Sequence, residues 1–169
     1  MALTVERIQQ ARERISPYIV QTPMLRMKSL DRYLGCQVYV KAECMQTTGS
    51  FKLRGAVNKA LTLTPEQLKC GIVAASSGNH GKGIAYAAKM LGSKATIVVP
   101  YTTTRVKVDA IRALGAEIVQ CETPVRFQVA EELSRKLGAT MIQSFNDEDI
   151  MAGQGTAGLE IVEQCPEVD

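Results

Sequence analysis

The fold is decided by residues 71–99, which read GIVAASSGNHGKGIAYAAKMLGSKATIVV. Two apolar runs, at 71–75 and 95–99, flank a segment from 79 to 91 with helical spacing of its apolar residues. Strands that are apolar on both sides are typical of a parallel sheet covered by helices. The stretch therefore predicts an α/β protein, a three-layer open parallel sheet with helices on both faces.

Working outward from this unit, the same alternation continues along the chain. It predicts further helices over 5–15, 51–61, 105–114, 125–137 and 154–163, and further strands over 37–40, 117–120 and 140–143. Gly92, Gly115 and Gly138 each follow a leucine where a predicted helix ends. We expect these glycines to take the left-handed conformation that caps a helix before the next strand.

The composition is that of an ordinary globular domain. The chain has 169 residues, of which 46% are apolar and 22% charged, so it fits about one domain. Its net charge of +3 gives no reason to expect nucleic acid or a membrane as a partner. These values exclude disorder, collagen, a coiled coil and a basic binding tail.

The cysteines and the N-terminus indicate a compartment. The chain has five cysteines and one histidine, with no C-x-x-C pair, so we expect reduced thiols and no metal site. No apolar run approaches the roughly 20 residues that a membrane helix needs. The first residues have a helical period rather than the apolar stretch of a signal peptide. We therefore expect a cytoplasmic protein.

The first segment that carries chemistry is GSFKLRGA, residues 49–56. Ser50 is a good N-cap, which places Lys52 in the first turn of a helix. The positive helix end and the neighbouring cation Arg54 both disfavour the ammonium form, and an uncharged amine forms an imine with an aldehyde. Phe51 is suited to lie against a flat cofactor. The alternative interpretation is a solvated lysine on a capped helix.

The second segment is ASSGNHGKG, residues 75–83, directly after an apolar strand. Open α/β sheets bind ligands at the carboxyl ends of their strands, and glycines with free N–H groups at a helix start favour an anion. The spacing fits neither a P-loop, because Ile84 stands where lysine is needed, nor the dinucleotide fingerprint. A substrate carboxylate is the best candidate anion. The alternative is a tight turn with a polar face.

The third segment, AGQGTAG at 152–158, allows two interpretations. It could form another anion cradle at a helix start, or its small residues could pack the helix closely on a neighbour, which we favour. The acidic run beside it, NDED at 146–149, could suggest acid–base or metal chemistry. We interpret that run as a solvated loop.

Together, three motifs resemble one family in their order and separations. They are QTTGSFKLRGA at 46–56, SSGNHG at 76–81 and AGQGT at 152–156. The chain resembles the N-terminal half of the fold-type II pyridoxal-phosphate enzymes, in particular the threonine/serine dehydratase and serine racemase branch. The resemblance implies a fold like that of the tryptophan synthase β subunit.

The resemblance also implies the residues that bind the cofactor, pyridoxal phosphate. Lys52 would hold it covalently and later move protons at the substrate α-carbon. Phe51 would lie close to its ring, and Asn79 would hydrogen-bond its 3′-hydroxyl. Asn146 matches an asparagine that lies near the cofactor on the racemase side of the branch.

The substrate site implied by the resemblance is the loop after the first buried strand. Its residues would bind the carboxylate of a small hydroxy amino acid; they are Ser76, Ser77, Gly78, Asn79 and His80. Ser77 also matches the residue that acts in racemases as the base on the face opposite the lysine. Because many dehydratases have alanine there, the serine leaves racemisation open.

The resemblance divides the chain into parts of two domains. Residues 1–70 and 149–169 would belong to an unfinished larger domain, and residues 71–148 would form the smaller one. The family's phosphate-binding loop lies beyond residue 169, so we expect poor cofactor retention and little turnover by this chain alone. The exposed edge of an unfinished sheet leads us to expect self-association into a homo-oligomer.

The implied activity is a dehydratase that yields 2-oxobutanoate or pyruvate plus ammonia. Alternatives are a serine racemase-type activity and a non-catalytic binding or regulatory module. A β-replacement enzyme such as cysteine synthase fits less well, because its asparagine loop usually ends in Thr-Gly where this chain has His80-Gly81.

Overall fold

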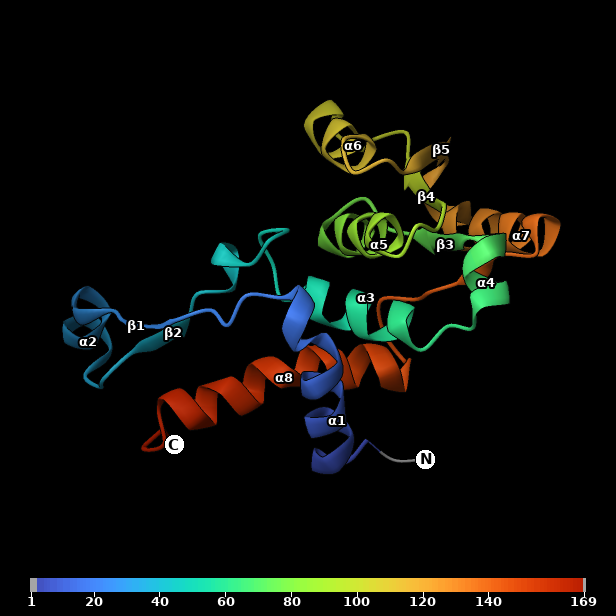
Figure 1. Ribbon diagram of the computed structural model, residues 1–169. Helices are drawn as coiled ribbons and strands as arrows, with labels where there is room; N and C mark the ends of the chain where they lie inside the picture. Colours follow the sequence, from blue (N-terminus) through green and yellow to red (C-terminus); the bar gives the residue numbers. More distant parts are fainter. Residues whose placement is uncertain (1–2, 169) are drawn as a thin grey trace.

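The computed structural model describes residues 3–168 and contains the predicted parallel sheet (Figure 1). The strand order is β5-β4-β3-β6, and every neighbouring pair is parallel. The strands are β3 (Ile72–Ala75), β4 (Ala95–Pro100), β5 (Glu117–Cys121) and β6 (Thr140–Met141). The last is two residues shorter than predicted; the other three agree with prediction to within one residue.

Helices cover both faces of this sheet, as the sequence predicts. On one face α5 (Asn79–Met90) and α6 (Arg105–Arg112) pack with alternate strand residues such as Ile97. On the other face α7 (Arg126–Leu137) packs with the intervening strand residues such as Val98. Adjacent strand residues point to opposite faces, so both faces are apolar and three layers form. The sheet and these helices lie within residues 71–148, whose boundaries as a domain stay a prediction.

The helix-ending glycines behave as expected. Gly92, Gly115 and Gly138 have φ values of 66°, 88° and 65°, in the region that favours glycine because it has no Cβ. Each ends a helix and turns the chain toward the next strand. The three turns fix where the strands begin.

A second set of helices packs beneath the sheet. Here α3 (Lys52–Leu61) lies between α5 and α8 (Glu148–Gln164), and α1 (Val5–Ile15) packs on α8 and α3 (Figure 1). The smaller elements are η1 (Ser16–Tyr18), β1 (Met24–Arg26), α2 (Lys28–Leu34), β2 (Tyr39–Lys41), η2 (Glu43–Met45), α4 (Pro65–Cys70) and η3 (Thr123–Val125). The antiparallel pair β1–β2 and α2 form an arm that projects from the body.

The start of α8 corrects the prediction. The helix begins at Glu148 rather than near 154, because the carboxylate of Asp147 caps it by accepting hydrogen bonds from the backbone N–H groups of Asp149 and Ile150. Residues 147–149 are therefore a helix cap and first turn rather than a solvated loop, whereas Asn146 is exposed just before the cap. Residues 152–158 lie inside the helix, so the interpretation of that segment as an anion cradle at a helix start is wrong.

The packing interpretation of residues 152–158 is confirmed. A Cβ on Gly153 would lie 2.5 Å from the backbone oxygen of Arg54 and 2.7 Å from the Cα of Gly55. A Cβ on Gly55 would lie 2.7 Å from the backbone oxygen of Ile150. The two glycines thus let α3 and α8 cross with their backbones in contact.

The side chain of Arg54 is fully buried in a network of ionic groups on the α8 side of α3. Its guanidinium donates to both carboxylate oxygens of Glu43 and to both of Glu160, at 2.7–2.9 Å. Lys41 also bonds Glu160, at 2.6 Å. Burial raises the pKa of Glu160, but its hydrogen bonds to Arg54 and Lys41 outweigh this and lower it. The positive charge of Arg54 is therefore balanced by its two carboxylate partners. Arg54 is not the free cation beside Lys52 that was expected from the sequence.

None of the helices in residues 3–168 combines the length and apolar character needed to cross a membrane.

Candidate active site

The sheet topology creates a crevice at one edge. From β3 the chain proceeds outward to β4 and β5, whereas β6 lies on the other side of β3, so the strand order reverses there. Ligands bind open α/β sheets at the carboxyl edge where the strand order reverses. The loop after β3 (residues 76–78) and the linker after β6 (residues 142–147) both leave this edge.

Lys52 reaches the linker after β6 from the first turn of α3. Its Nζ donates to the backbone oxygen of Ser144 and to Oε1 of Gln154, both at 3.4 Å. The side chain is partly buried, and Nζ lies 5.1 Å from the centre of the Phe51 ring. The N-cap of α3 is Phe51 rather than the predicted Ser50, but the Ser50 hydroxyl accepts a hydrogen bond from the Lys52 backbone N–H at 3.1 Å. The amine is therefore partly buried and held by two acceptors, one of them in the linker after β6.

His80 reaches the same linker from the second motif. The ring is 4% exposed, and Nε2 lies 3.2 Å from the backbone oxygen of Ile142. Because a carbonyl only accepts, Nε2 carries the proton and donates it. Burial lowers the pKa of His80, and the nearby charge of Lys52 lowers it further, outweighing the Ile142 hydrogen bond and the charge of Asp147, which raise it. The imidazole is thus neutral, and the first two motifs meet at one linker.

The predicted carboxylate loop lines a groove of about 490 Å³ at the carboxyl edge. Its lining residues come from the loops after four strands: Ala75, Ser76, Ser77, Gly78, Pro100, Thr102, Thr123, Arg126, Phe127, Ser144 and Phe145. The Ser76 hydroxyl accepts a hydrogen bond from the Gly78 N–H at 3.3 Å. Hydroxyl groups, a helix start and the cation Arg126 suit the groove to an anion.

Several lining residues were not predicted from the sequence, such as Thr102, Thr123 and Phe145. They belong to no motif, and only the parallel order of the strands brings them together. The signal that could have found them was their position in the sequence, because each residue follows a predicted strand. Arg126 is held in place by its hydrogen bond to the backbone oxygen of Thr123 and lies 4.5 Å from the Phe127 ring centre.

The remaining predicted site residues lie near the crevice but do not line the groove. Asn79 is the exposed first residue of α5, and Phe51 is 40% exposed just before α3. Asn146 is exposed in the linker and has φ +54°, a positive value that no other non-glycine residue has among the described residues. Such backbone conformations often mark functional segments. The roles of these three residues stay predictions.

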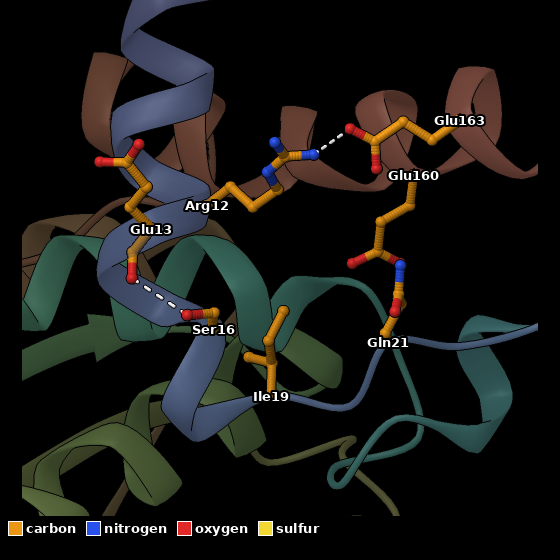
Figure 2. A pocket seen from close by; sticks show the side chains of 7 residues that line it. All are labelled: Arg12, Glu13, Ser16, Ile19, Gln21, Glu160 and Glu163. Carbon is orange, nitrogen blue, oxygen red and sulfur yellow. Dashed lines mark hydrogen bonds and ion pairs between the residues drawn. The ribbon is translucent and has the colours of Figure 1, made fainter.

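A second hollow, of about 410 Å³, is lined by a different set of residues (Figure 2). Its walls come from the end of α1, residues 16–21 and the second half of α8, with an ion pair between Arg12 and Glu163 at its border. The carboxylate of Glu160 at its wall is already bonded to Arg54 and Lys41. None of the predicted site residues lines this hollow.

Comparison with known proteins identifies one family that matches most of this chain. A family described as "Pyridoxal-phosphate dependent enzyme" matches residues 15–169. Serine racemase from Oryza sativa subsp. indica is 38% identical over 99% of this chain and 50% of its own length. L-threonine ammonia-lyase from Thermotoga maritima is 39% identical over 99% of this chain and 42% of its own length.

A solved structure of a pyridoxal 5'-phosphate-dependent aspartate racemase superposes with a TM-score of 0.95 at 43% identity, covering 100% of this chain and 54% of that one. This chain therefore spans about half the length of the proteins that it matches.

Proposed function

The chain belongs to the pyridoxal-phosphate dependent enzyme family, and we propose that it carries the lysine and carboxylate-binding parts of a threonine or serine dehydratase. The reaction would convert a small hydroxy amino acid to 2-oxobutanoate or pyruvate plus ammonia. The observation that carries the proposal is the meeting of Lys52 and His80 at the linker that borders the groove. A cytoplasmic location and a homo-oligomer belong to the same proposal.

The residues at the crevice fit an aldehyde cofactor. Lys52 offers an amine held by two acceptors, and Nε2 of Gln154 and Nδ1 of His80 are buried without a hydrogen-bond partner in residues 3–168. Lys52 would hold pyridoxal phosphate, with Phe51, Asn79 and Asn146 beside it. When bound, the cofactor supplies an electron sink for the pair left behind as the substrate α-proton departs.

The chain's own residues would orient the substrate and move its protons. Ser76, Ser77 and Gly78 would bind the substrate carboxylate at the start of α5, where backbone N–H groups favour an anion. The Lys52 amine would take the proton from the α-carbon. Binding the carboxylate on a rigid strand end fixes the α-carbon relative to that amine.

A trapping experiment tests this proposal. After incubation with pyridoxal phosphate and reduction with borohydride, mass spectrometry is expected to locate the phosphopyridoxyl adduct at Lys52. Lys52→Arg should remove that adduct, because the guanidinium stays protonated and is not nucleophilic. Lys107→Arg, at an exposed lysine of α6, should leave it unchanged. Labelling spread evenly over surface lysines would support a non-catalytic binding module instead.

Racemisation is the second candidate function, and the placement of Ser77 favours it. The Ser77 side chain belongs to the groove lining, so a second proton-carrying group is available besides Lys52. With L-serine and pyridoxal phosphate, chiral chromatography should detect D-serine. Ser77→Ala should reduce D-serine at least tenfold while solvent exchange of the α-proton, followed by NMR, persists. An unaltered D-serine yield in the variant would contradict this candidate.

A further inference from the structure

Gln154 of α8 contacts the amine of Lys52, although the sequence analysis gave it no role. Its Oε1 lies 3.4 Å from Lys52 Nζ. The only other acceptor recorded for this amine in residues 3–168 is the backbone oxygen of Ser144, also at 3.4 Å. A side-chain acceptor and a main-chain acceptor therefore define the position of the amine.

The crossing of α3 and α8 positions Gln154 beside the Lys52 amine. Gly153 packs against the backbone of Arg54 and Gly55, so the next residue of α8 lies beside the first turn of α3. A Cβ on Gly55 would lie 3.0 Å from both Cγ and Nε2 of Gln154. Glycine at position 55 thus leaves the space that the Gln154 side chain occupies.

The amide nitrogen of Gln154 is a free donor beside the amine. Nε2 is buried and has no hydrogen-bond partner within the described residues. A buried N–H without an acceptor is unfavourable, and most such groups in native proteins do have one. The amide group whose oxygen lies 3.4 Å from the Lys52 amine therefore carries one unsatisfied donor.

We propose that Gln154 is a positioning residue for Lys52: its Oε1 holds the amine, and its Nε2 donates to an oxygen atom of the aldehyde or amino acid bound there. The donor role rests on the proposed function, whereas the acceptor role does not. Of the titratable groups at this linker, His80 has its pKa lowered by burial and by the charge of Lys52, and Asp147 pairs with Lys59 at 3.0 Å.

Competitive labelling with acetic anhydride tests the acceptor role without any cofactor. Labelling of Lys52, followed by mass spectrometry across pH, reports the fraction of free amine. Gln154→Glu should raise the midpoint of the Lys52 labelling curve by about 1 pH unit or more, because a carboxylate at this distance favours the ammonium form of Lys52. Gln10→Glu, at an exposed position of α1, should leave the midpoint unchanged. An unchanged midpoint in folded Gln154→Glu overturns the acceptor role.

Gln154→Met gives a second route should the glutamate variant fail to fold. It keeps the length of the side chain but removes the amide, so the midpoint should move down; no movement overturns the acceptor role. For the donor role, borohydride trapping with pyridoxal phosphate is repeated at a pH above all midpoints. There Gln154→Met should lower the Lys52 adduct about tenfold.

The outcomes separate the two proposals. A parent chain that forms no Lys52 adduct overturns the proposed function and the donor role, while labelling still decides the acceptor role. A parent chain that forms the adduct, with an equal yield in Gln154→Met, overturns the donor role alone.

Discussion

Replacing Arg54 with methionine is expected to lower the free energy of unfolding by about 3–5 kcal/mol, because removing one member of a buried ion pair leaves an uncompensated charge. The guanidinium is fully buried and satisfies two carboxylates, Glu43 and Glu160. Without it only Lys41, of the positive charges recorded in this network, remains close to Glu160. Methionine fills much of the volume of the arginine side chain, so the loss of stability reports mainly the removal of the positive charge.

Urea denaturation at pH 7 measures this effect. Arg105→Met is the control, because that side chain is 93% exposed and pairs with Asp109 across one helical turn; we expect a change within about 0.5 kcal/mol. The double variant R54M/E160Q should be no less stable than R54M, because it removes one charge of each sign. An R54M variant as stable as the control would contradict the assignment of the network as a buried, coupled unit.

The pH dependence of this effect has a definite sign. The pKa of Glu160 in the folded chain is lowered from its ordinary value of 4.5. The stabilisation is therefore present above that value and is lost as the pH falls toward the folded pKa. The difference between R54M and the parent chain should accordingly be smaller at pH 3 than at pH 7.

The parallel sheet was predictable because its signals are local. Residues 72–74 and 95–100 are buried at every position, on both faces of the sheet, and the sequence shows this as runs in which Thr96 is the only polar residue. The arm was predictable only in part: the strand expected over 37–40 overlaps β2 (Tyr39–Lys41), whereas β1 and α2 were not predicted. Its strands β1 and β2 have three residues each, and α2 has seven, too few for a hydrophobic period to emerge.

The start of α8 was missed because two signals conflict there. Gly153 lowers helix propensity, and the polar run at 146–149 was interpreted as a solvated loop, so the predicted helix began only at 154. The Asp147 cap and the α3 crossing override that propensity. The candidate site shows the same division: Lys52 and Ser76–His80 were assigned from their motifs, whereas the contact of Gln154 with Lys52 and the place of Arg126 in the groove come from tertiary packing.

The second large prediction concerns the α3–α8 crossing: Gly153→Ala should lower the free energy of unfolding by about 1–3 kcal/mol. The added Cβ would meet the backbone oxygen of Arg54 at 2.5 Å and the Cα of Gly55 at 2.7 Å. These are backbone atoms of α3, so a side-chain rotation cannot relieve the clash and the helices must separate. Thermal or urea unfolding followed by circular dichroism measures the loss.

Gly158→Ala, in the same helix, separates packing from helix propensity. Position 158 is exposed, and a Cβ there meets no atom of the described residues within 4 Å. Alanine should therefore stabilise by about 0.5–1 kcal/mol, the usual preference of a helix for alanine over glycine. The same substitution thus has opposite signs at two positions five residues apart. Equal effects would mean that the crossing at Gly153 is looser than the contact distances require.

The Gly153→Ala variant should also lose reactivity at Lys52, because separating α8 from α3 withdraws Gln154 from the amine. Trapping with pyridoxal phosphate and borohydride should give less Lys52 adduct in Gly153→Ala under conditions where both chains are folded, and an unchanged amount in Gly158→Ala. A destabilised Gly153→Ala that retains the full adduct would show that the crossing stabilises the fold without positioning the amine. Joint loss would tie the helix crossing directly to the chemistry at Lys52.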